Sequence, residues 1–306
     1  MGSLEEQFVD CGGYATHLYV ATHRSQSRGP LLLVLPGNPG VASFYLSFAG
    51  VISQRLPHAR LAIVGHSGHF VNPDQENTRY VGLEEQAKHK AAVLDHLNAE
   101  VYPGCLKSGT VLLAHSIGSW ISMELRELRP DLDIRIFHLC PTFRHLYEGF
   151  SWGVKLATVP GVSWFLANVI HYLPNRVRKA LIWLAGHADT DEILLVAEDH
   201  VDFYCVRNIL HMAAEEAVIV RETRPAHLEQ MRKGRDFFYF SQIDHYVPLR
   251  YVDDLKRCVD NIDCVIAEKD VEHAFVLRHA EHVAEVCLTR LEPIFAHFVP
   301  EKMQMK

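Results

Sequence analysis

Short apolar runs alternate with longer segments of helical periodicity along most of the chain. The apolar runs predict strands, most of them buried on both faces of a sheet. They cover 14–21, 31–35, 61–65, 110–114, 134–139, 237–240 and 263–267. In the segments 43–56, 83–101, 117–128, 249–258 and 280–298, apolar residues recur at spacings of three and four. This order predicts an α/β fold, a mostly parallel sheet with helices on both faces.

One long segment breaks the alternation and predicts an inserted helical cap at 143–228, between core parts 1–142 and 229–306. Within it, 150–173 is unusually rich in aromatic and aliphatic residues, with Pro160 and Gly161 in the middle. A membrane-spanning helix needs about 20 consecutive apolar residues. Lys155 and His171 leave a shorter stretch, which the Pro-Gly pair divides, so we do not expect a bilayer crossing.

Composition excludes several classes of protein. The chain has 306 residues, of which 48% are hydrophobic and 22% charged, as in a globular protein. Its net charge of −7 gives no general attraction for nucleic acid. The 7 cysteines form no CxxC pair, which argues against a disulfide framework or a zinc cluster. No apolar leader opens the sequence, so we expect the protein on the cytosolic side.

The first candidate for chemistry is Ser116, in the run Ala114-His115-Ser116-Ile117-Gly118. A buried strand turns directly into a helix there, as in a nucleophile elbow, where the residues two before and two after the serine must be small. Ala114 replaces the usual glycine, and we expect one extra methyl group to be tolerated. The alternative is a serine that only caps the helix.

A serine nucleophile requires a histidine base and an acid that orients it, in the chain order serine, acid, histidine. Asp244 follows the strand 237–240, and His273 follows the strand 263–267. Because the carboxyl ends of parallel strands share one edge of a sheet, we expect Ser116, Asp244 and His273 to meet there.

Other residues compete for these roles. The other candidate acids are Asp199, Asp236 and Asp270. The first lies in the cap, the second precedes its strand, and the third is too close to His273 in sequence.

The histidines also have alternatives. His245 adjoins Asp244 but we expect it to face another way, and His279 and His282 lie at helical spacing without an HExxH motif, which favours a solvated helix face. The sequence therefore predicts no metal site and no organic cofactor.

The loop 36–40, Pro-Gly-Asn-Pro-Gly, follows an early strand and is placed to complete an oxyanion hole. Pro39 has no N–H group, so we expect the amides of Asn38 and Ile117 to be the two donors. A plain strand-to-helix turn is the alternative.

Three further residues are predicted to line the substrate site: Gly37, His115 and Ser67. Ser67 also lies in a run that imitates a nucleophile motif, but no helix follows it.

Several motifs together resemble the lipid droplet-associated hydrolase family of α/β-hydrolases. They are the 36–40 loop, His66 to His69, the Ser116 elbow, Ile243-Asp244 and His273-Ala274-Phe275. The resemblance implies an α/β-hydrolase fold and a catalytic triad of Ser116, Asp244 and His273. It also implies a serine hydrolase that cleaves sterol or acylglycerol esters at the lipid droplet surface, with further pools on the cytosolic face of the endoplasmic reticulum and in the cytoplasm.

The apolar part of the cap fits such a surface, because an arm bent at Pro160-Gly161 can lie in a lipid monolayer without crossing it. We expect Trp164 and Phe165 to contact lipid, and the basic residues Arg176, Arg178 and Lys179 to meet anionic headgroups. An ordinary lid over the active site is the alternative. Two other functions also stay open: a droplet-binding protein with little turnover, and a soluble carboxylesterase. The sequence predicts no particular protein partner.

Overall fold

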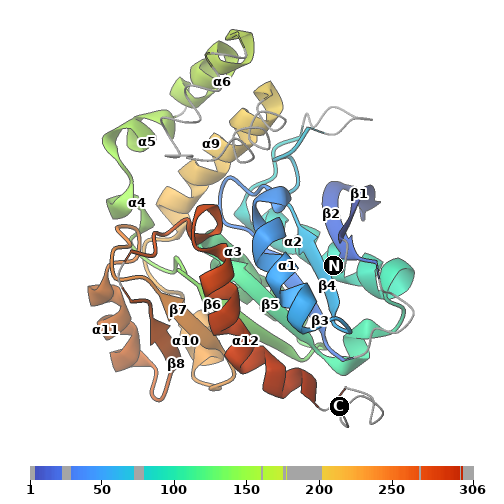
Figure 1. The fold of residues 1–306 in the computed structure, drawn as a ribbon. Helices are drawn as coiled ribbons and strands as arrows, with labels where there is room; N and C mark the ends of the chain where they lie inside the picture. The colour runs from blue at the N-terminus through green and yellow to red at the C-terminus, as the bar shows by residue number, and fades with distance from the viewer. Residues whose placement is uncertain are drawn as a thin grey trace.

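Eight strands form a single sheet in the order β1-β2-β4-β3-β5-β6-β7-β8 (Figure 1). The computed structural model describes residues 4–22, 29–71, 79–159, 161–174, 177, 202–268, 270–296 and 298. The strands are β1 Leu4–Cys11, β2 Tyr14–Ala21, β3 Leu31–Leu35, β4 Arg60–Val64, β5 Thr110–His115, β6 Ile134–Leu139, β7 Phe237–Phe240 and β8 Asp263–Ile266. Among the strands described, β2 alone points in the opposite direction to the others, so its pairings with β1 and β4 are antiparallel and the remaining pairings are parallel. The predicted α/β-hydrolase fold is confirmed.

The first strand was not predicted from the sequence. β1 lies at the edge of the sheet, so most of its residues are exposed or half-buried and it lacks a continuous apolar run. It pairs with β2 through a tight turn at Gly12 and Gly13, both of which have positive φ angles. A turn of this kind joins two antiparallel strands without splaying them.

Helices cover both faces of the sheet. The core helices are α1 Leu46–Arg55, α2 Leu83–His96, α3 Ile117–Leu128, α11 Leu249–Cys258 and α12 Ala280–Ala296. α2, α3 and α11 pack on one face, and α1 and α12 on the other. Two predicted helices are divided: a 3₁₀ turn, Ala42–Tyr45, precedes α1, and a π-helical turn, Leu97–Val101, extends α2.

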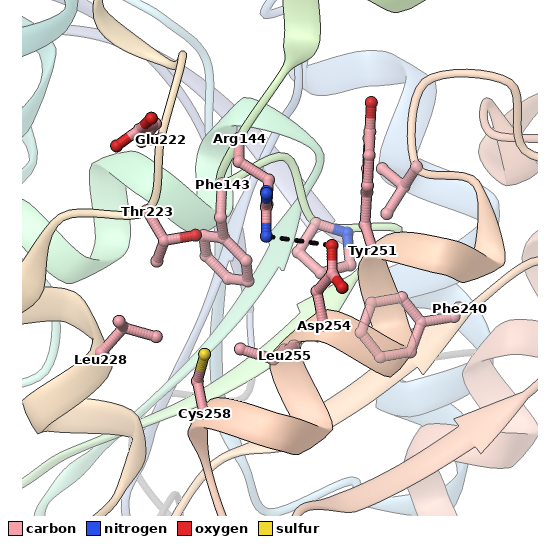
Figure 2. Close-up of a pocket in the computed structure, with 12 residues that line it drawn as sticks. Phe143, Arg144, Glu222, Thr223, Leu228, Phe240, Tyr251, Asp254, Leu255 and Cys258 are labelled. Carbon is pink, nitrogen blue, oxygen red and sulfur yellow. Dashed lines mark ion pairs between the residues drawn. The ribbon is translucent and has the colours of Figure 1, made fainter.

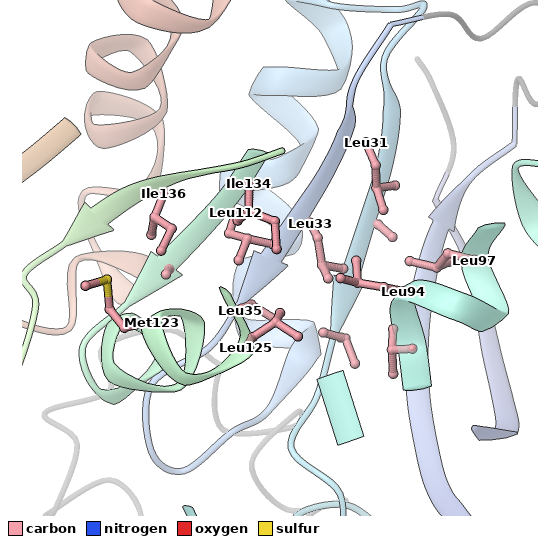
Figure 3. Close-up of a cluster of buried hydrophobic side chains, with 14 of the residues drawn as sticks. Leu31, Leu33, Leu35, Leu94, Leu97, Leu112, Met123, Leu125, Ile134 and Ile136 are labelled. Atoms are coloured by element: carbon pink, nitrogen blue, oxygen red, sulfur yellow. The ribbon is translucent and has the colours of Figure 1, made fainter. Parts of the chain in front are cut away.

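Alternate residues of the central strands supply the two apolar layers. In β3, Leu31, Leu33 and Leu35 face α2 and α3, while Leu32 and Val34 face α1 and α12. Figure 3 shows the first of these layers, where leucines of the strands meet side chains of α2 and α3. Because both faces are buried, the strands are continuously apolar, which explains why the sequence pattern identifies them.

The inserted segment lies between the end of β6 and the start of β7. Its helices are α4 Leu146–Gly149, α5 Trp152–Ala157, α6 Val162–Tyr172, α9 Phe203–Ile219 and α10 Pro225–Met231. α9 contacts α2, α4 and α6, and a small apolar cluster that includes Trp120 and Met212 joins α9 to α3. The division of the chain at 143 and 228 stays a prediction.

Helices α5 and α6, here called the arm, extend away from the sheet (Figure 1). Their apolar side chains are largely exposed: Trp152 is 88% exposed, Trp164 58% and Phe165 59%. α5 buries no residue and α6 buries only Ala167. No helix among the described residues has both the length and the apolar character needed to cross a bilayer.

Candidate active site

Ser116 occupies a sharp turn between β5, which ends at His115, and α3, which begins at Ile117. Its backbone has φ 52° and ψ −122°, a conformation that a non-glycine residue rarely adopts and that is typical of a nucleophile elbow. A Cβ atom at Gly118 would lie 2.6 Å from the Pro36 carbonyl oxygen, so only glycine fits there. On the other side of the serine, the methyl group of Ala114 is fully buried, and the elbow forms with alanine in place of glycine.

The three predicted triad residues meet at the carboxyl edge of the sheet. The Ser116 hydroxyl lies 2.8 Å from His273 Nε2, and His273 Nδ1 lies 2.6 Å from Asp244 Oδ2. The other Asp244 carboxylate oxygen accepts hydrogen bonds from the amides of Tyr246 and Val247, at 2.8 and 3.0 Å. These contacts orient the carboxylate toward the imidazole.

The ionisation of Asp244 determines which nitrogen of His273 carries a proton. Burial alone would raise the pKa of Asp244, but the charge of His273 and hydrogen bonds from His273, Val247 and Tyr246 hold that pKa below its usual range. An ionised carboxylate only accepts hydrogen bonds, so His273 Nδ1 carries a proton and Nε2 is free to accept the Ser116 hydroxyl proton. The arrangement can therefore activate a serine nucleophile.

The competing acids lie elsewhere. Asp236 accepts two hydrogen bonds of 2.8 Å from Arg126 and one from the Ile136 amide, so it stabilises the fold between α3 and β6. Asp270 is exposed. Asp199 lies outside the described residues.

The neighbouring histidine does not join the site either. His245, beside Asp244 in the chain, is exposed and packs against the ring of Tyr246.

The loop after β3 approaches the serine closely. A Cβ atom on Gly37 would lie 2.8 Å from Ser116 Cβ, so glycine is required for this contact. Within the loop, the Gly37 amide donates to the Tyr45 hydroxyl and the Gly40 amide to the Gly37 carbonyl. The backbone N–H group of Asn38 makes no hydrogen bond with any residue that the structure describes. The Ile117 amide opens α3 and has no acceptor within the helix.

The side chain of Asn38 connects this loop to the cap. The side-chain nitrogen, Asn38 Nδ2, donates to Glu216 Oε1 at 3.0 Å and to the Ile209 carbonyl at 3.2 Å, both on α9. Burial raises the pKa of Glu216 to about 8, although the Asn38 hydrogen bond opposes this shift. The cap helix and the predicted oxyanion loop are therefore held together by a partly buried polar contact.

The structure does not bring Ser67 to the triad. Its hydroxyl donates to the Ala15 carbonyl at 2.9 Å, and the surrounding cluster includes His69, whose Nδ1 donates to the Pro39 carbonyl at 2.8 Å. Burial lowers the pKa of Lys90, in the same cluster, well below its usual range. The His69 contact stabilises the loop 36–40. A substrate-lining role for Ser67 stays a prediction.

A cavity of about 270 Å³ lies beside the triad rather than at it. Figure 2 shows that Phe143 and Arg144, after β6, face α11 across it, with Arg144 3.2 Å from Asp254 in an ion pair. Val247, whose amide contacts Asp244, is one of the lining residues, but no triad residue lines the cavity.

Two polar side chains at this edge were not identified from the sequence. Tyr45 falls near the start of the predicted helix 43–56 and Glu216 within the predicted cap 143–228, and no motif marks either. His115, predicted to line the substrate site, has both ring nitrogens in contact with protein groups, Tyr45 and the His273 carbonyl. Among the described residues, no group of three or more His, Cys, Asp or Glu side chains is arranged to hold a metal ion.

Comparison with known proteins gives a consistent result. The profile of the lipid-droplet associated hydrolase family matches residues 28–276. The lipid droplet-associated hydrolase of Dictyostelium discoideum is 30% identical over 267 residues, covering 83% of this chain and 84% of its own length. The human lipid droplet-associated hydrolase is 28% identical, covering 94% of this chain and 95% of its own length.

Solved structures support the fold alone. The haloalkane dehalogenase DbeA of Bradyrhizobium elkani has a TM-score of 0.68 at 14% identity, covering 96% of this chain and 100% of its own.

Proposed function

The chain belongs to the lipid-droplet associated hydrolase family, and we propose that it is a serine hydrolase that cleaves carboxylic esters of neutral lipids through an acyl-Ser116 intermediate. The observation that carries the proposal is the pair of hydrogen bonds that links Ser116 to His273 at 2.8 Å and His273 to Asp244 at 2.6 Å. Sterol esters and acylglycerols are the proposed substrates, since the names of the relatives point to stored lipid.

In the first half of the reaction, His273 Nε2 accepts the hydroxyl proton of Ser116 as the serine oxygen attacks the ester carbonyl. Asp244 holds the imidazole in the required tautomer and stabilises its positive charge. The amides of Ile117 and Asn38 receive the negative charge that develops on the carbonyl oxygen; one such donor contributes about 3–4 kcal/mol to the transition state.

Collapse of the tetrahedral intermediate breaks the bond to the alcohol, which leaves with the proton from His273. Water then enters, and His273 accepts one of its protons as the water oxygen attacks the acyl carbonyl. The second tetrahedral intermediate breaks its bond to the serine oxygen, which takes the proton back from His273, and the fatty acid is released. The triad and the two amides account for every proton transfer and charge contact in these steps, so the proposed reaction includes no metal or cofactor.

We also place this reaction at the surface of lipid droplets. The exposed aromatic side chains of the arm, including Trp164 and Phe165, support attachment, because an apolar side chain transferred from water to lipid gains about 1.5–3 kcal/mol. The basic residues Arg176, Arg178 and Lys179 lie outside the described residues. The cytosolic face of the endoplasmic reticulum and a cytoplasmic pool complete the proposed distribution.

Labelling with a fluorophosphonate probe tests the nucleophile directly. The folded wild-type protein is expected to react, and Ser116→Ala is expected to give no labelling. Ser108→Ala is the control, since Ser108 lies in the turn before β5, at the opposite end of that strand from Ser116, and should leave labelling unchanged. Hydrolysis of a cholesteryl ester and a triacylglycerol in emulsion would then identify the preferred substrate.

The same experiment separates the alternatives. A folded wild-type protein that never reacts with the probe would contradict the proposal and favour a droplet-binding protein that retains the hydrolase fold. A protein that reacts with the probe but ignores droplets would favour a soluble carboxylesterase whose cap is only a lid.

A further inference from the structure

Two buried side chains connect three separate parts of the candidate site. The Tyr45 hydroxyl accepts a hydrogen bond from the Gly37 amide at 2.9 Å and lies 2.6 Å from His115 Nδ1. His115 Nε2 in turn lies 2.9 Å from the backbone carbonyl oxygen of His273. Tyr45 is 3% exposed and His115 5%, so water has little access to the two hydrogen bonds of the Tyr45 hydroxyl.

The chemistry of each partner fixes the direction of these hydrogen bonds. A carbonyl oxygen only accepts, so His115 Nε2 carries the proton that it donates to His273. In a neutral imidazole the other nitrogen is then an acceptor, and the Tyr45 hydroxyl donates to it. The Tyr45 oxygen still accepts the Gly37 amide proton. Each of these buried polar atoms therefore has a partner.

Neither side chain changes its charge near neutral pH. Burial, together with the nearby His273, lowers the pKa of His115 to about 3, and burial raises the pKa of Tyr45. Of the other groups that affect these two, Asp244 acts on His115 and the buried Cys140 acts on Tyr45. The hydrogen-bond directions thus persist across the pH range in which an esterase works.

We propose that Tyr45 and His115 are positioning residues. They hold two backbone segments in register with Ser116: the loop that carries the base His273, and the predicted oxyanion loop 36–40. This inference rests on the proposed function. His115 immediately precedes the nucleophile, donates to the residue that carries the base, and reaches the oxyanion loop through Tyr45 and Gly37. A misplacement of about 1 Å can lower a catalytic rate about 100-fold, so small shifts of either loop are costly.

Three substitutions of His115 separate its two contacts. Glutamine places an amide near Nε2 and keeps the donor to His273. Asparagine places its side-chain oxygen near Nδ1 and keeps the contact with Tyr45, and leucine loses both. We expect kcat to fall less than threefold in His115→Gln, about tenfold in His115→Asn and about 100-fold in His115→Leu, with KM unchanged.

Tyr45→Phe removes the link to the oxyanion loop and should lower kcat about tenfold, again without a change in KM. Tyr239→Phe is the matched control, because the buried Tyr239 hydroxyl has no hydrogen-bond partner among the residues that the structure describes, and its removal should leave kcat unchanged. Equal losses in His115→Gln and His115→Asn, losses that follow the melting temperature alone, or a change confined to KM would overturn the proposal.

Nitrogen-15 NMR of the histidine rings gives a readout that does not depend on turnover. We expect His115 as the Nε2–H tautomer, and a low-field proton on His273 Nδ1 that broadens in Tyr45→Phe and His115→Leu but not in Tyr239→Phe. If folded wild-type protein shows no esterase activity, the proposed function fails and this measurement alone decides the positioning role. An Nδ1–H tautomer of His115, or an unchanged His273 signal in both variants, would refute it.

Discussion

The carboxyl edge of the sheet and the arm differ in how they treat polar and apolar groups. At the edge, Ser116, Asp244 and His273 are largely buried, and each has a hydrogen-bond partner. In the arm, aromatic side chains such as Trp164 and Phe165 are more than half exposed. A buried polar group is costly unless it is bonded, whereas an exposed apolar group is costly until an apolar phase covers it. The edge is therefore complete within the chain, whereas the arm would gain an apolar environment from the droplet surface that we propose for it. Chemistry and attachment should thus be separable by mutation.

The largest effect is expected at the edge. Asp244→Asn removes the charge that holds His273 in its tautomer, and kcat on a soluble short-chain ester should fall about 10⁴-fold. Asp270→Asn is the matched control, because this exposed acid lies closer to His273 in the chain but forms no hydrogen bond or ion pair with it among the described residues. Retained activity in Asp244→Asn, or an equal loss in Asp270→Asn, would show that the acid is misassigned.

The arm should respond in the opposite way. Trp164→Asp combined with Phe165→Asp should lower partition onto phospholipid-coated triolein droplets about 20- to 400-fold, since each side chain is a little over half exposed and its burial in lipid contributes about 1–2 kcal/mol. Turnover of the soluble ester should not change. Leu128→Asp, at an exposed apolar position at the end of α3, should leave droplet binding as in wild type. Unchanged partition of the double variant would mean that the arm is a lid rather than an anchor.

Acid should destabilise the core, because protonation affects the buried carboxylate of Asp236. The arm has no such group, since 152–172 contains no Asp or Glu. Burial would raise the pKa of Asp236, but His138 and Arg126 lower it to about 2. Because this pKa is depressed in the folded protein, its stabilisation is complete above about pH 4 and is lost between pH 4 and 2. Urea unfolding should show about 2 kcal/mol of this loss in wild type. Asp236→Asn should lack it, and parallel pH profiles for the two proteins would contradict the assignment.

The smallest effect concerns the alanine of the elbow. Ala114→Gly restores the more usual motif, but it adds backbone freedom within a strand and should lower the free energy of unfolding by about 0.5–1 kcal/mol. Fluorophosphonate labelling should stay within twofold of wild type. A large gain in labelling rate would indicate instead that the extra methyl group distorts the elbow.

The sequence predicts best those features that depend on local pattern. The strand that ends at His115 is continuously buried, so its apolar run marks the turn at Ser116. Asp244 and His273 follow strands of the same kind, and parallel topology brings strand ends together without any knowledge of distances. The fold class is confirmed, and the structure brings the three side chains into contact, while their catalytic roles remain to be measured.

Features that depend on contacts through space leave no such pattern. The edge strand β1 consists mostly of half-buried and exposed residues, so no continuous apolar run marks it. Tyr45 contacts Gly37 and His115 only because a turn before α1 folds against the elbow. Glu216 meets Asn38 across 178 positions of the chain, and no spacing rule connects them. Side-chain pairs between distant segments therefore required coordinates.

The contact between Asn38 and Glu216 has a consequence for chimeric proteins. Helix α9 of the insertion is hydrogen-bonded to the loop 36–40, which lies against Ser116. The insertion therefore cannot be exchanged independently of that loop. Where a relative carries another residue in place of Glu216, its transplanted insertion would not form this hydrogen bond with Asn38 unless both residues are transferred together. Recombination among family members should accordingly succeed most often when its breakpoints keep this pair from a single parent.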